Sequence, residues 1–582
     1  MEVDDLMSSH TESRFGPAYR TQSLGRFASE KFDVLVLGGG VTGCGVALDA
    51  ASRGLSVALV EKRDFAAGTS SRSSKLIHGG LRYLENFDIE LVREALHERS
   101  LLVEKIAPHL VHPTPFLFPL KHPGWDRFYM GSGLFLYDAL AGLHPAVPHH
   151  RHLTRRSCLR AVPALRSDSL TGGIRYFDAQ VDDARFSLVL ARTAAAHGAV
   201  CVSAAGVVGF LHEGDRVAGV RVEDLESGGE FEVRASTVVN ATGIWTTEME
   251  RLAGVANPMI VRPSKGVHIV VPRDRIDSQY ALILRTEKSV LFVLPWGDRW
   301  IIGTTDTDWE FGLDHPSATH ADIEYLLDHA NEALRDPLGF DDVIAAYVGL
   351  RPLLGGTAEE TAKLSRKHAV RRGAPGLVSV AGGKYTTYRL MARDAVDLAA
   401  RDLRFAVDSS RTADLPLLGA VGLAGAEFRL ASHAGAAKLD PEQLHHLVAR
   451  YGTLASEVLD LIAADPSLAS PISGADKYVA GEVSYAAAQE GALHVDDVLT
   501  RRTHIAFEAP DRGQRAAGEV ARLMAPVLGW DEVAIAREVA HYEARLAAEA
   551  AAQALWTDAD SDSARAGVRD PRLEHFGSKK GS

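Results

Sequence analysis

Residues 31–61 of this 582-residue chain read KFDVLVLGGGVTGCGVALDAASRGLSVALVE and decide the fold class. Two apolar runs rich in Val and Leu, residues 32–37 and 55–60, flank a glycine-rich turn and a helical stretch. Short apolar runs of this kind are typical of parallel strands that are buried on both faces. The stretch therefore predicts a strand, a helix and a second strand of an α/β fold.

The turn carries the spacing Gly38-x-Gly40-x-x-Gly43, which is weak evidence alone but stronger between a strand and a helix. Gly38 permits a tight turn, Gly40 lets the backbone approach a pyrophosphate, and Gly43 allows close contact between helix and strand. The helix N-terminus would face the phosphates. Glu61 ends the second strand and would accept hydrogen bonds from an adenosine ribose, which disfavours NADP. The spacing predicts a dinucleotide site and leaves NAD and FAD open.

The composition is that of an ordinary globular protein, with 46% hydrophobic and 24% charged residues. A net charge of −13 gives no overall basic field that would attract nucleic acid. Cys44, Cys158 and Cys201 lie far apart without CxxC spacing, which fits a reducing compartment and excludes a disulfide scaffold or a zinc ribbon. We see neither a secretory signal nor an apolar run of 18 residues, so we expect a cytoplasmic protein with no spanning helix.

The predicted secondary structure changes along the chain. Strand-like runs and turns dominate between about 170 and 350, and WGDRW at 296–300 predicts a hairpin. Beyond about 410 the sequence is alanine-rich and predicts helices, whereas both ends of the chain are polar and predict disorder. The predicted domains are a disordered tail at 1–30, an oxidoreductase region of interleaved subdomains at 31–400, a helical domain at 410–556 and a disordered tail at 557–582.

Two further stretches end a predicted strand with small residues. STVVNATGIWT ends at Ala241-Thr242-Gly243, as in a second dinucleotide-contacting strand, but ordinary strands also end in this way. AGGKYTT at 381–387 places Gly382 and Gly383 before a predicted helix. It is not a phosphate-binding P-loop, because the upstream glycine and the Ser or Thr after the lysine are missing. Bare N–H groups and the positive end of the helix dipole at this turn would stabilise negative charge.

Residues 69–85, TSSRSSKLIHGGLRYLE, are dense in hydroxyl groups and glycine and carry Lys75, His78 and Arg82. Together with GGGVTGCGVALDAASRG at 38–54, they closely resemble the FAD-dependent glycerol-3-phosphate dehydrogenases of the aerobic, quinone-linked type. The resemblance covers roughly residues 31 to 550. It continues in VDDAR (181–185), VNATGIW (239–245), KGVHIVVP (265–272), VLPWGDRWIIGTTD (293–306), VGLRPL (348–353), VAGGKYTTYRLMA (380–392), RYG (450–452) and EVSYAAAQEGALHVDDVLTRRTHI (482–505).

The resemblance implies a Rossmann-like FAD-binding domain interleaved with a β-rich substrate domain, plus a C-terminal α-helical cap domain. It implies oxidation of sn-glycerol 3-phosphate to dihydroxyacetone phosphate, with electrons passed from FAD to a quinone. A lipid-soluble acceptor implies peripheral contact with the cytoplasmic face of a membrane, with the alanine-rich helices past residue 410 as candidates. A homodimer stays open. The alternatives are an oxidase that uses oxygen and a dinucleotide-binding sensor without turnover.

The resemblance also implies a role for particular residues. The residues predicted to contact the substrate are Arg82, Tyr83, His268, Arg351 and Lys384, and those predicted to contact FAD are Gly38, Gly40, Gly43, Glu61, Thr69, Ser70, Ser74, Ala241, Gly243, Gly382, Gly383 and Thr386. Arginine and lysine suit a phosphate group, and Tyr83 can donate to a substrate oxygen. His268 can be neutral near pH 7, so we expect it to be the general base, with Arg351 steadying the developing oxyanion. Without the resemblance, a strand histidine bonded to backbone is the plainer interpretation.

Three other features have weaker interpretations, and no metal site is predicted. Asp306 either supports a site residue or caps a turn. PHHRH at 148–152 is interpreted as surface. Arg501 and Arg502 could form a basic face, but one pair in an acidic protein is weak evidence for membrane or nucleic-acid contact.

Overall fold

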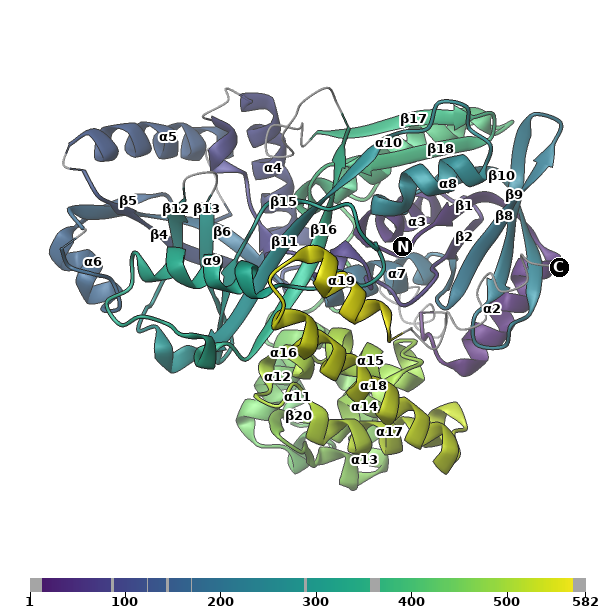
Figure 1. Cartoon of the computed structure of the whole chain (residues 1–582). Coiled ribbons are helices and arrows are strands. Elements are labelled where there is room, and N and C mark those ends of the chain that lie inside the picture. The colour runs from purple at the N-terminus through teal and green to yellow at the C-terminus, as the bar shows by residue number, and fades with distance from the viewer. Residues whose placement is uncertain are drawn as a thin grey trace.

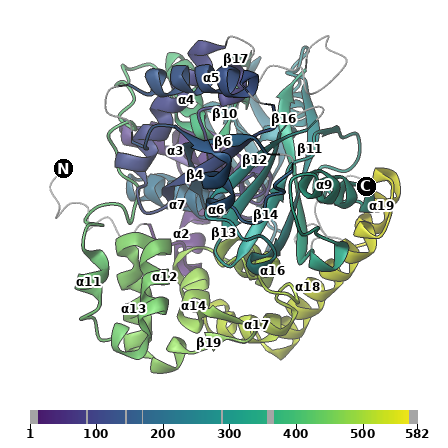
Figure 2. The ribbon, with the colours of Figure 1, turned by 90° about the vertical axis from the view of Figure 1, so that its left-hand side faces the viewer.

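A computed structural model describes residues 13–84, 88–122, 124–142, 146–168, 170–286, 290–355 and 367–568. Two mixed β-sheets lie side by side, and a helical domain lies below both of them (Figure 1). The same arrangement is visible after a quarter turn, with the helices of the C-terminal part at the bottom (Figure 2). The predicted fold class is confirmed.

The first sheet has the strand order β17-β18-β10-β1-β2-β7, and β8 and β9 extend from β10. Strand β1 pairs in parallel with β2 and β10, which agrees with the apolar runs in the sequence. Helices α3, α7 and α10 pack against one another beside this sheet. The bounds are β1 Lys31–Leu37, α3 Val41–Ser52, β2 Val57–Val60, α7 Asp183–Ala196, β7 Val200–Val202, β8 Ala205–Glu213, β9 Arg216–Asp224, β10 Glu230–Asn240, α8 Thr246–Leu252, β17 His368–Ala374, β18 Leu377–Gly382 and α10 Tyr388–Ala399.

The second sheet has the strand order β15-β11-β14-β13-β12-β4-β6-β3, with β16 paired to β11 and β5 to β6. Its strands come from segments between those of the first sheet, so the two subdomains are interleaved as predicted. The hairpin at 296–300 joins β13 to β14. The bounds are β3 Leu76–Ile77, α4 Ile89–Leu101, β4 Val111–Leu120, α5 Trp125–Ala141, β5 Arg151–Thr154, α6 Arg155–Ala161, β6 Gly172–Val181, β11 Val261–Pro272, β12 Ala281–Arg285, β13 Val290–Trp296, β14 Arg299–Gly303, β15 Thr307–Asp308, α9 His320–Asn331 and β16 Ala345–Leu354.

The C-terminal part is helical apart from a two-stranded sheet. Leu447 and Leu459 belong to the same buried apolar cluster as Leu190 of α7, so the helical domain shares a core with the first sheet. The bounds are α11 Ala426–Leu430, α12 Pro441–Tyr451, α13 Ala455–Ala464, β19 Pro471–Ile472, β20 Ala475–Val479, α14 Ala480–Gln489, α15 Val495–Asp497, α16 Ile505–Glu508, α17 Gln514–Leu528, α18 Glu532–Gln553 and α19 Asp558–Ala566.

Buried ion pairs fasten the helical domain to the first sheet. Arg185 of α7 donates to both carboxylate oxygens of Glu490, at 2.7 and 3.0 Å. Arg502 donates to Asp64 at 2.7 and 2.8 Å, and Arg501 donates to the same carboxylate at 2.5 Å. The basic face considered for Arg501 and Arg502, for which the sequence evidence was weak, is therefore excluded, because both side chains are buried in the domain interface.

The structure also corrects part of both predicted tails. Helix α2 (Pro17–Ser29) lies within the first tail and buries Phe27, which is 1% exposed and packs against Phe32 and Phe231. Helix α19 lies within the second tail and buries Ser561 against Ser317. Polar composition predicted disorder in both places, but one or two well-placed side chains dock each helix on the main body. Residues 1–12 and 569–582 lie outside the described residues.

None of the helices described is both long enough and apolar enough to cross a membrane.

Candidate active site

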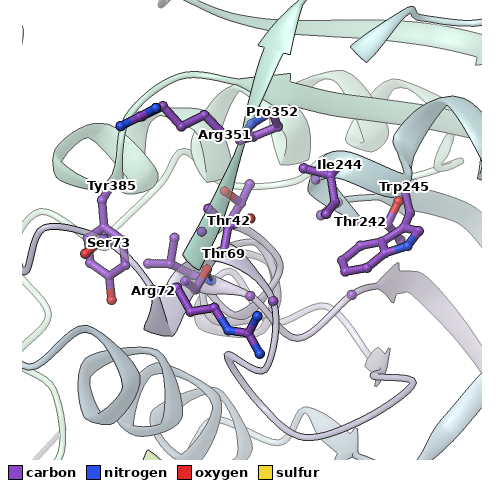
Figure 3. A pocket seen from close by; sticks show the side chains of 18 of the residues that line it. Thr42, Thr69, Arg72, Ser73, Thr242, Ile244, Trp245, Arg351, Pro352 and Tyr385 are labelled. Carbon is purple, nitrogen blue, oxygen red and sulfur yellow. Dashed lines mark hydrogen bonds between the residues drawn. The ribbon is translucent and has the colours of Figure 1, made fainter. Parts of the chain in front are cut away.

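A cavity of about 550 Å³ lies where the two sheets meet. It runs along the carboxyl ends of β1 and β2, the N-terminus of α3 and one edge of β11 and β16. Figure 3 shows Thr42 and Thr69 in its middle, Trp245 toward one end, and Arg351 and Tyr385 toward the other. Of the residues predicted from the sequence, those that line the cavity are Gly38, Gly40, Glu61, Thr69, Ser70, Ser74, Tyr83, Ala241, Gly243, His268, Arg351, Gly382, Gly383 and Lys384.

One end of the cavity is formed by the glycine turn that opens α3. Gly38 has a φ of +100°, and a Cβ atom there would lie 2.9 Å from the carbonyl oxygen of Ala241. Gly40 is the N-cap of α3, so the bare N–H groups and the positive end of the helix dipole face this part of the cavity. Gly43 does not line the cavity, and a Cβ atom there would lie 1.9 Å from the oxygen of Gly38. It permits the close contact of helix and strand that the sequence predicted.

Glu61 holds this turn in shape. One carboxylate oxygen accepts the N–H of Gly39 at 2.6 Å, and the other accepts the N–H of Arg63 at 2.8 Å. Its contact with a ribose therefore stays a prediction, although the side chain lines the cavity at the expected place. Ser70 joins the same turn, because its hydroxyl group accepts the N–H of Val41 at 2.9 Å.

The far side of the cofactor end of the cavity is apolar, and we did not predict its residues from the sequence. Val207, Val208, Met249 and Leu252 line it, from β8 and α8. They suit the flat, apolar faces of an adenine ring. No local pattern marks these residues, since they are ordinary strand and helix positions. Trp245 also lines the cavity and could have been noticed, because it lies two residues after Gly243, the last residue of the predicted Ala241-Thr242-Gly243 strand end.

The other end of the cavity contains His268, on strand β11. His268 is opposite Gly303 of β14 and Tyr347 of β16 in the sheet register. Its ring stacks on that of Tyr347, with centroids 4.8 Å apart and planes at 10°. Its Nε2 atom lies 2.8 Å from the hydroxyl oxygen of Ser74. Burial, followed by the charges of Arg351 and Lys75, holds the pKa of His268 well below its ordinary value, so the imidazole is neutral at pH 7.

Two further predicted cations, Arg351 and Lys384, line the same cavity as His268. Arg351 of β16 donates to the hydroxyl oxygen of Thr304 at 2.9 Å and forms an ion pair with Asp306 at 3.3 Å. Asp306 thus supports a predicted site residue, which decides between its two interpretations. The Nζ atom of Lys384 lies 3.6 Å from the ring centre of Tyr83, so these two predicted residues are in contact.

The remaining predictions differ in outcome. Gly382 and Gly383 have φ values of +77° and +78° and present backbone to the cavity before α10. Thr386 does not line the cavity; its hydroxyl oxygen accepts the N–H of His78 at 3.1 Å, so it joins two segments instead. The side chain of Arg82 lies outside the described residues.

The residues present fit a bound FAD. The glycine turn leaves space that Cβ atoms would fill, and a helix N-terminus faces that space. The volume of the cavity lies within the usual range for cofactor sites. From the apolar patch near Val207 to His268, one continuous cavity offers an adenine surface, a phosphate cradle and a polar reaction end.

Comparison with known proteins agrees with an FAD-binding site in this cavity. The family model described as FAD dependent oxidoreductase matches residues 33–396, and that described as the C-terminal domain of alpha-glycerophosphate oxidase matches residues 410–535. Glycerol-3-phosphate dehydrogenase 2 of Mycobacterium tuberculosis is 55% identical over 560 residues, which cover 96% of this chain and 95% of that protein. The human mitochondrial glycerol-3-phosphate dehydrogenase is 37% identical over 564 residues, which cover 92% of this chain and 76% of that protein.

A solved structure agrees as well. The glycerol-3-phosphate dehydrogenase from Bacillus halodurans, complexed with FAD, superimposes with a TM-score of 0.75 at 29% identity. The match covers 91% of this chain and 97% of that chain. With the cradle, the cavity and these relatives together, the chain belongs to the FAD-dependent glycerol-3-phosphate dehydrogenase family, and its cofactor is FAD.

Proposed function

We propose that the protein oxidises sn-glycerol 3-phosphate to dihydroxyacetone phosphate and delivers the electrons to a quinone at a membrane surface. One observation carries the first part: a single cavity is lined by a dinucleotide-binding glycine turn and by the buried His268, together with Arg351 and Lys384. FAD bound along the glycine turn would supply the acceptor for the hydride from carbon 2 of the substrate.

His268 is the general base in this proposal. The hydroxyl group on carbon 2 must lose its proton as the hydride leaves, and a neutral imidazole can accept it whereas arginine cannot. The low pKa of His268 supports this role, because it keeps the ring neutral over the physiological range. Ser74 and the stacked ring of Tyr347 fix the plane of the imidazole before the substrate enters.

Arg351 and Lys384 bind the substrate's phosphate and oxygens. Arg351 is oriented by Thr304 and Asp306, so its guanidinium group is held in place in advance of binding. Lys384 lies over the ring of Tyr83, which limits its freedom in the same way. Charge-assisted hydrogen bonds from such groups hold a phosphate in register. Arg82 keeps its predicted role as a further phosphate ligand.

A sensor without turnover is disfavoured, because it would not need His268, Arg351 and Lys384 to converge on the cofactor cavity. An oxidase remains the rival, since the same cavity would serve it and oxygen reactivity depends on access to the flavin. Oxygen consumption with sn-glycerol 3-phosphate, with and without a quinone analogue, decides between them. We expect little peroxide and a rate that depends on the quinone; abundant peroxide without dependence on the quinone would show an oxidase.

Helix α5 supports the membrane part of the proposal. Trp125, Phe128 and Phe135 are 68%, 70% and 70% exposed, which is unusual for aromatic side chains on one helix. The helix lies at the end of the molecule opposite the helical domain in both views (Figures 1 and 2). Aromatic side chains on the exposed side of a helix are typical of contact with the interface of a bilayer. The structure thus favours α5 over the helices past residue 410 that the sequence suggested.

A second cavity supports a quinone as the acceptor. It has about 270 Å³ and opens beside α5, where its lining includes Phe118, Tyr129 and Ile283. In the sheet register, His268 is opposite Gly303, Gly303 opposite Phe292, and Phe292 opposite Ile283. Three strand spacings separate His268 from Ile283, which is roughly 14 Å. An apolar ring in this cavity would therefore lie near the reaction end of the main cavity but outside it.

The membrane part can be tested apart from the chemistry. Trp125→Ser/Phe128→Ser/Phe135→Ser should lower binding to vesicles of mixed neutral and anionic lipid and slow reduction of a long-chain quinone. Reduction of a water-soluble dye by sn-glycerol 3-phosphate should be unchanged. The matched control is Phe428→Ser, since Phe428 is 87% exposed on the helical domain. Equal vesicle binding by both variants and the unaltered protein would contradict the role of α5.

A further inference from the structure

A fully buried ion pair lies next to His268 and has no part in the reaction proposed above. Lys75 is 0% exposed, and its Nζ atom donates to Asp183 at 2.5 Å and to the carbonyl oxygen of Ser71 at 2.9 Å. The backbone of Lys75 has a φ of +58°, which an L-residue rarely adopts, so the surrounding contacts must hold it there. Both residues belong to stretches that the sequence singled out, TSSRSSK and VDDAR.

Aromatic rings enclose the charge of Lys75. Its Nζ atom lies 5.6 Å from the ring centre of Trp296, 5.4 Å from that of Tyr347 and 5.6 Å from that of Phe507. Such contacts are favourable for a cation. Tyr347 is the ring on which His268 stacks. Taken together, the two distances at Tyr347 place the ammonium group of Lys75 no farther than about 10 Å from the imidazole.

Asp183 organises the loop that reaches His268. Besides Lys75, its carboxylate accepts the N–H of Ser73 at 3.0 Å and the hydroxyl group of Ser73 at 2.6 Å. Tyr347 donates its hydroxyl group to the carbonyl oxygen of Ser73 at 3.0 Å. The next residue is Ser74, whose hydroxyl oxygen lies 2.8 Å from Nε2 of His268. The carboxylate therefore fixes the backbone from which Ser74 meets the imidazole.

We propose that Lys75 and Asp183 are positioning residues for His268: they fix Ser74 and Tyr347 against the imidazole, and the lysine end of the pair disfavours a positive charge on it. The inference rests on the proposed role of His268 as the general base. Beyond that role, residues of the segment before β3 and of the start of α7 keep the imidazole of the general base neutral and oriented.

The charges that face His268 come from few elements. From β16 comes Arg351, whose partner is Asp306; from the segment before β3 comes Lys75, whose partner is Asp183. Tyr347 is uncharged, because burial holds its pKa well above the ordinary value. Behind Lys75, on the segment that leads into α16, His504 lies 2.7 Å from Asp182, which also pairs with Arg450. Burial is the first cause of the lowered pKa of His268, and Arg351 and Lys75 follow.

Substitutions of Lys75 and of Asp183 should shift the pKa of His268 in opposite directions. Lys75→Met removes a positive charge, so the pKa of His268 should rise and the acidic limb of the pH profile should move to higher pH. Asp183→Asn removes a negative charge, so that limb should move to lower pH. A unit charge about 10 Å away at an effective permittivity of about 20 shifts a pKa by about one unit. In Lys75→Met/Asp183→Asn the two effects should nearly cancel.

The experiment is anaerobic rapid-mixing reduction of the FAD-loaded protein by sn-glycerol 3-phosphate between pH 4 and 9. Lys75→Arg should keep the limb where it is, because the charge is retained. Glu457→Gln is the matched control, since Glu457 is bound by the buried Arg192 in the domain interface, away from His268. If both single variants leave the limb in place, or move it in the same direction, the inference is overturned.

Two further outcomes separate the causes of failure. A limb that persists in His268→Ala would contradict the base assignment itself, whereas a limb lost there but unmoved in the pair variants would overturn only this inference. If Lys75→Met does not load FAD, Asp183→Asn carries the test, because the amide has the same shape and keeps an acceptor for Ser73. A merely structural pair would change stability and FAD content and leave the pH profile where it is.

Discussion

The two ends of the main cavity differ in the kind of group that forms them. The cofactor end is mostly backbone: Gly38 and Gly40 clear a space and the N-terminus of α3 faces it. The reaction end is mostly side chains, with His268, Arg351 and Lys384 on separate strands and turns. The glycine turn of the first end comes from one continuous stretch, residues 31–52, whereas the side chains of the second end come from segments spread over the chain.

This difference separates binding from chemistry. Backbone groups cannot be changed without moving the chain, so the cofactor end is sensitive to added volume. The reaction end is sensitive to charge and protonation, because its groups act through side chains. Substitutions at the first end should therefore remove FAD, while substitutions at the second should leave FAD bound and alter rates.

The largest effect should come from Gly43→Ala. The added Cβ atom would lie 1.9 Å from the oxygen of Gly38, so the turn must shift away from α3. We expect a folded protein that is nearly colourless, measured as flavin absorbance per protein. Gly25→Ala is the control, because a Cβ atom there meets nothing within 4 Å. Full flavin content in Gly43→Ala would show that the turn is not a tight cradle.

His268→Ala should have the next largest effect, at the other end of the cavity. Loss of a general base slows the chemical step by roughly 10²–10⁴ at saturating substrate. The deficit should shrink as pH rises and the substrate's hydroxyl group needs less help. FAD content should be unaltered. A near-normal rate of flavin reduction with weakened substrate binding would make His268 a binding residue.

Lys384→Ala and Arg351→Ala should have smaller effects, directed at the phosphate. Removing one partner of a desolvated charge pair costs on the order of 2–5 kcal/mol. We therefore expect kcat/KM for sn-glycerol 3-phosphate to fall by at least about thirtyfold, with glycerol affected less. Arg262→Ala is the control, since Arg262 lies on β11 but pairs with the half-exposed Asp308. Equal losses with both substrates would contradict a phosphate clamp.

Glu490→Gln should affect turnover least, because Glu490 lies at neither end of the cavity. Burial would raise the pKa of Glu490, but Arg185, together with Arg192 and Arg502, holds that pKa below its ordinary value. The pair therefore stabilises the protein above about pH 4.5, and this contribution is lost as pH falls. Breaking it should lower the free energy of unfolding by about 3–5 kcal/mol at pH 7.

Denaturant unfolding of Glu490→Gln and the unaltered protein at pH 7 and pH 4 checks this. The difference in free energy of unfolding between the two proteins should be smaller at pH 4 than at pH 7. A constant difference across pH would mean that the carboxylate keeps its ordinary pKa in the folded protein.

The glycine turn at the cofactor end was predictable because the residues that form it are close together in the sequence. The strand, turn and helix of residues 31–52 are adjacent in sequence, so the spacing of Gly38, Gly40 and Gly43 and its place between a strand and a helix were enough to predict their roles. His268 illustrates the opposite case. Nothing near it in sequence marks it, and its partners Ser74 and Tyr347 are 194 and 79 positions away. Only the resemblance to a family pointed to it.

Other features escaped because their partners are remote or their pattern is ambiguous. Arg501 and Arg502 look exposed in sequence, but Asp64, more than 430 residues away, neutralises them in the domain interface. Helix α2 lies in a polar segment and is docked by the burial of Phe27. The exposed aromatic side chains of α5 look like core residues in sequence, because periodicity shows that a helix has an apolar face but not which face stays uncovered.

We propose that one cavity couples FAD to a glycerol phosphate through charged side chains. The most direct measurement is the flavin spectrum of the purified protein under anaerobic conditions, with sn-glycerol 3-phosphate or glycerol added at equal concentration. We predict that the phosphorylated substrate bleaches the flavin band near its full extent within one turnover, while glycerol leaves it almost unchanged. Equal bleaching by both compounds, or none by sn-glycerol 3-phosphate, would contradict the account.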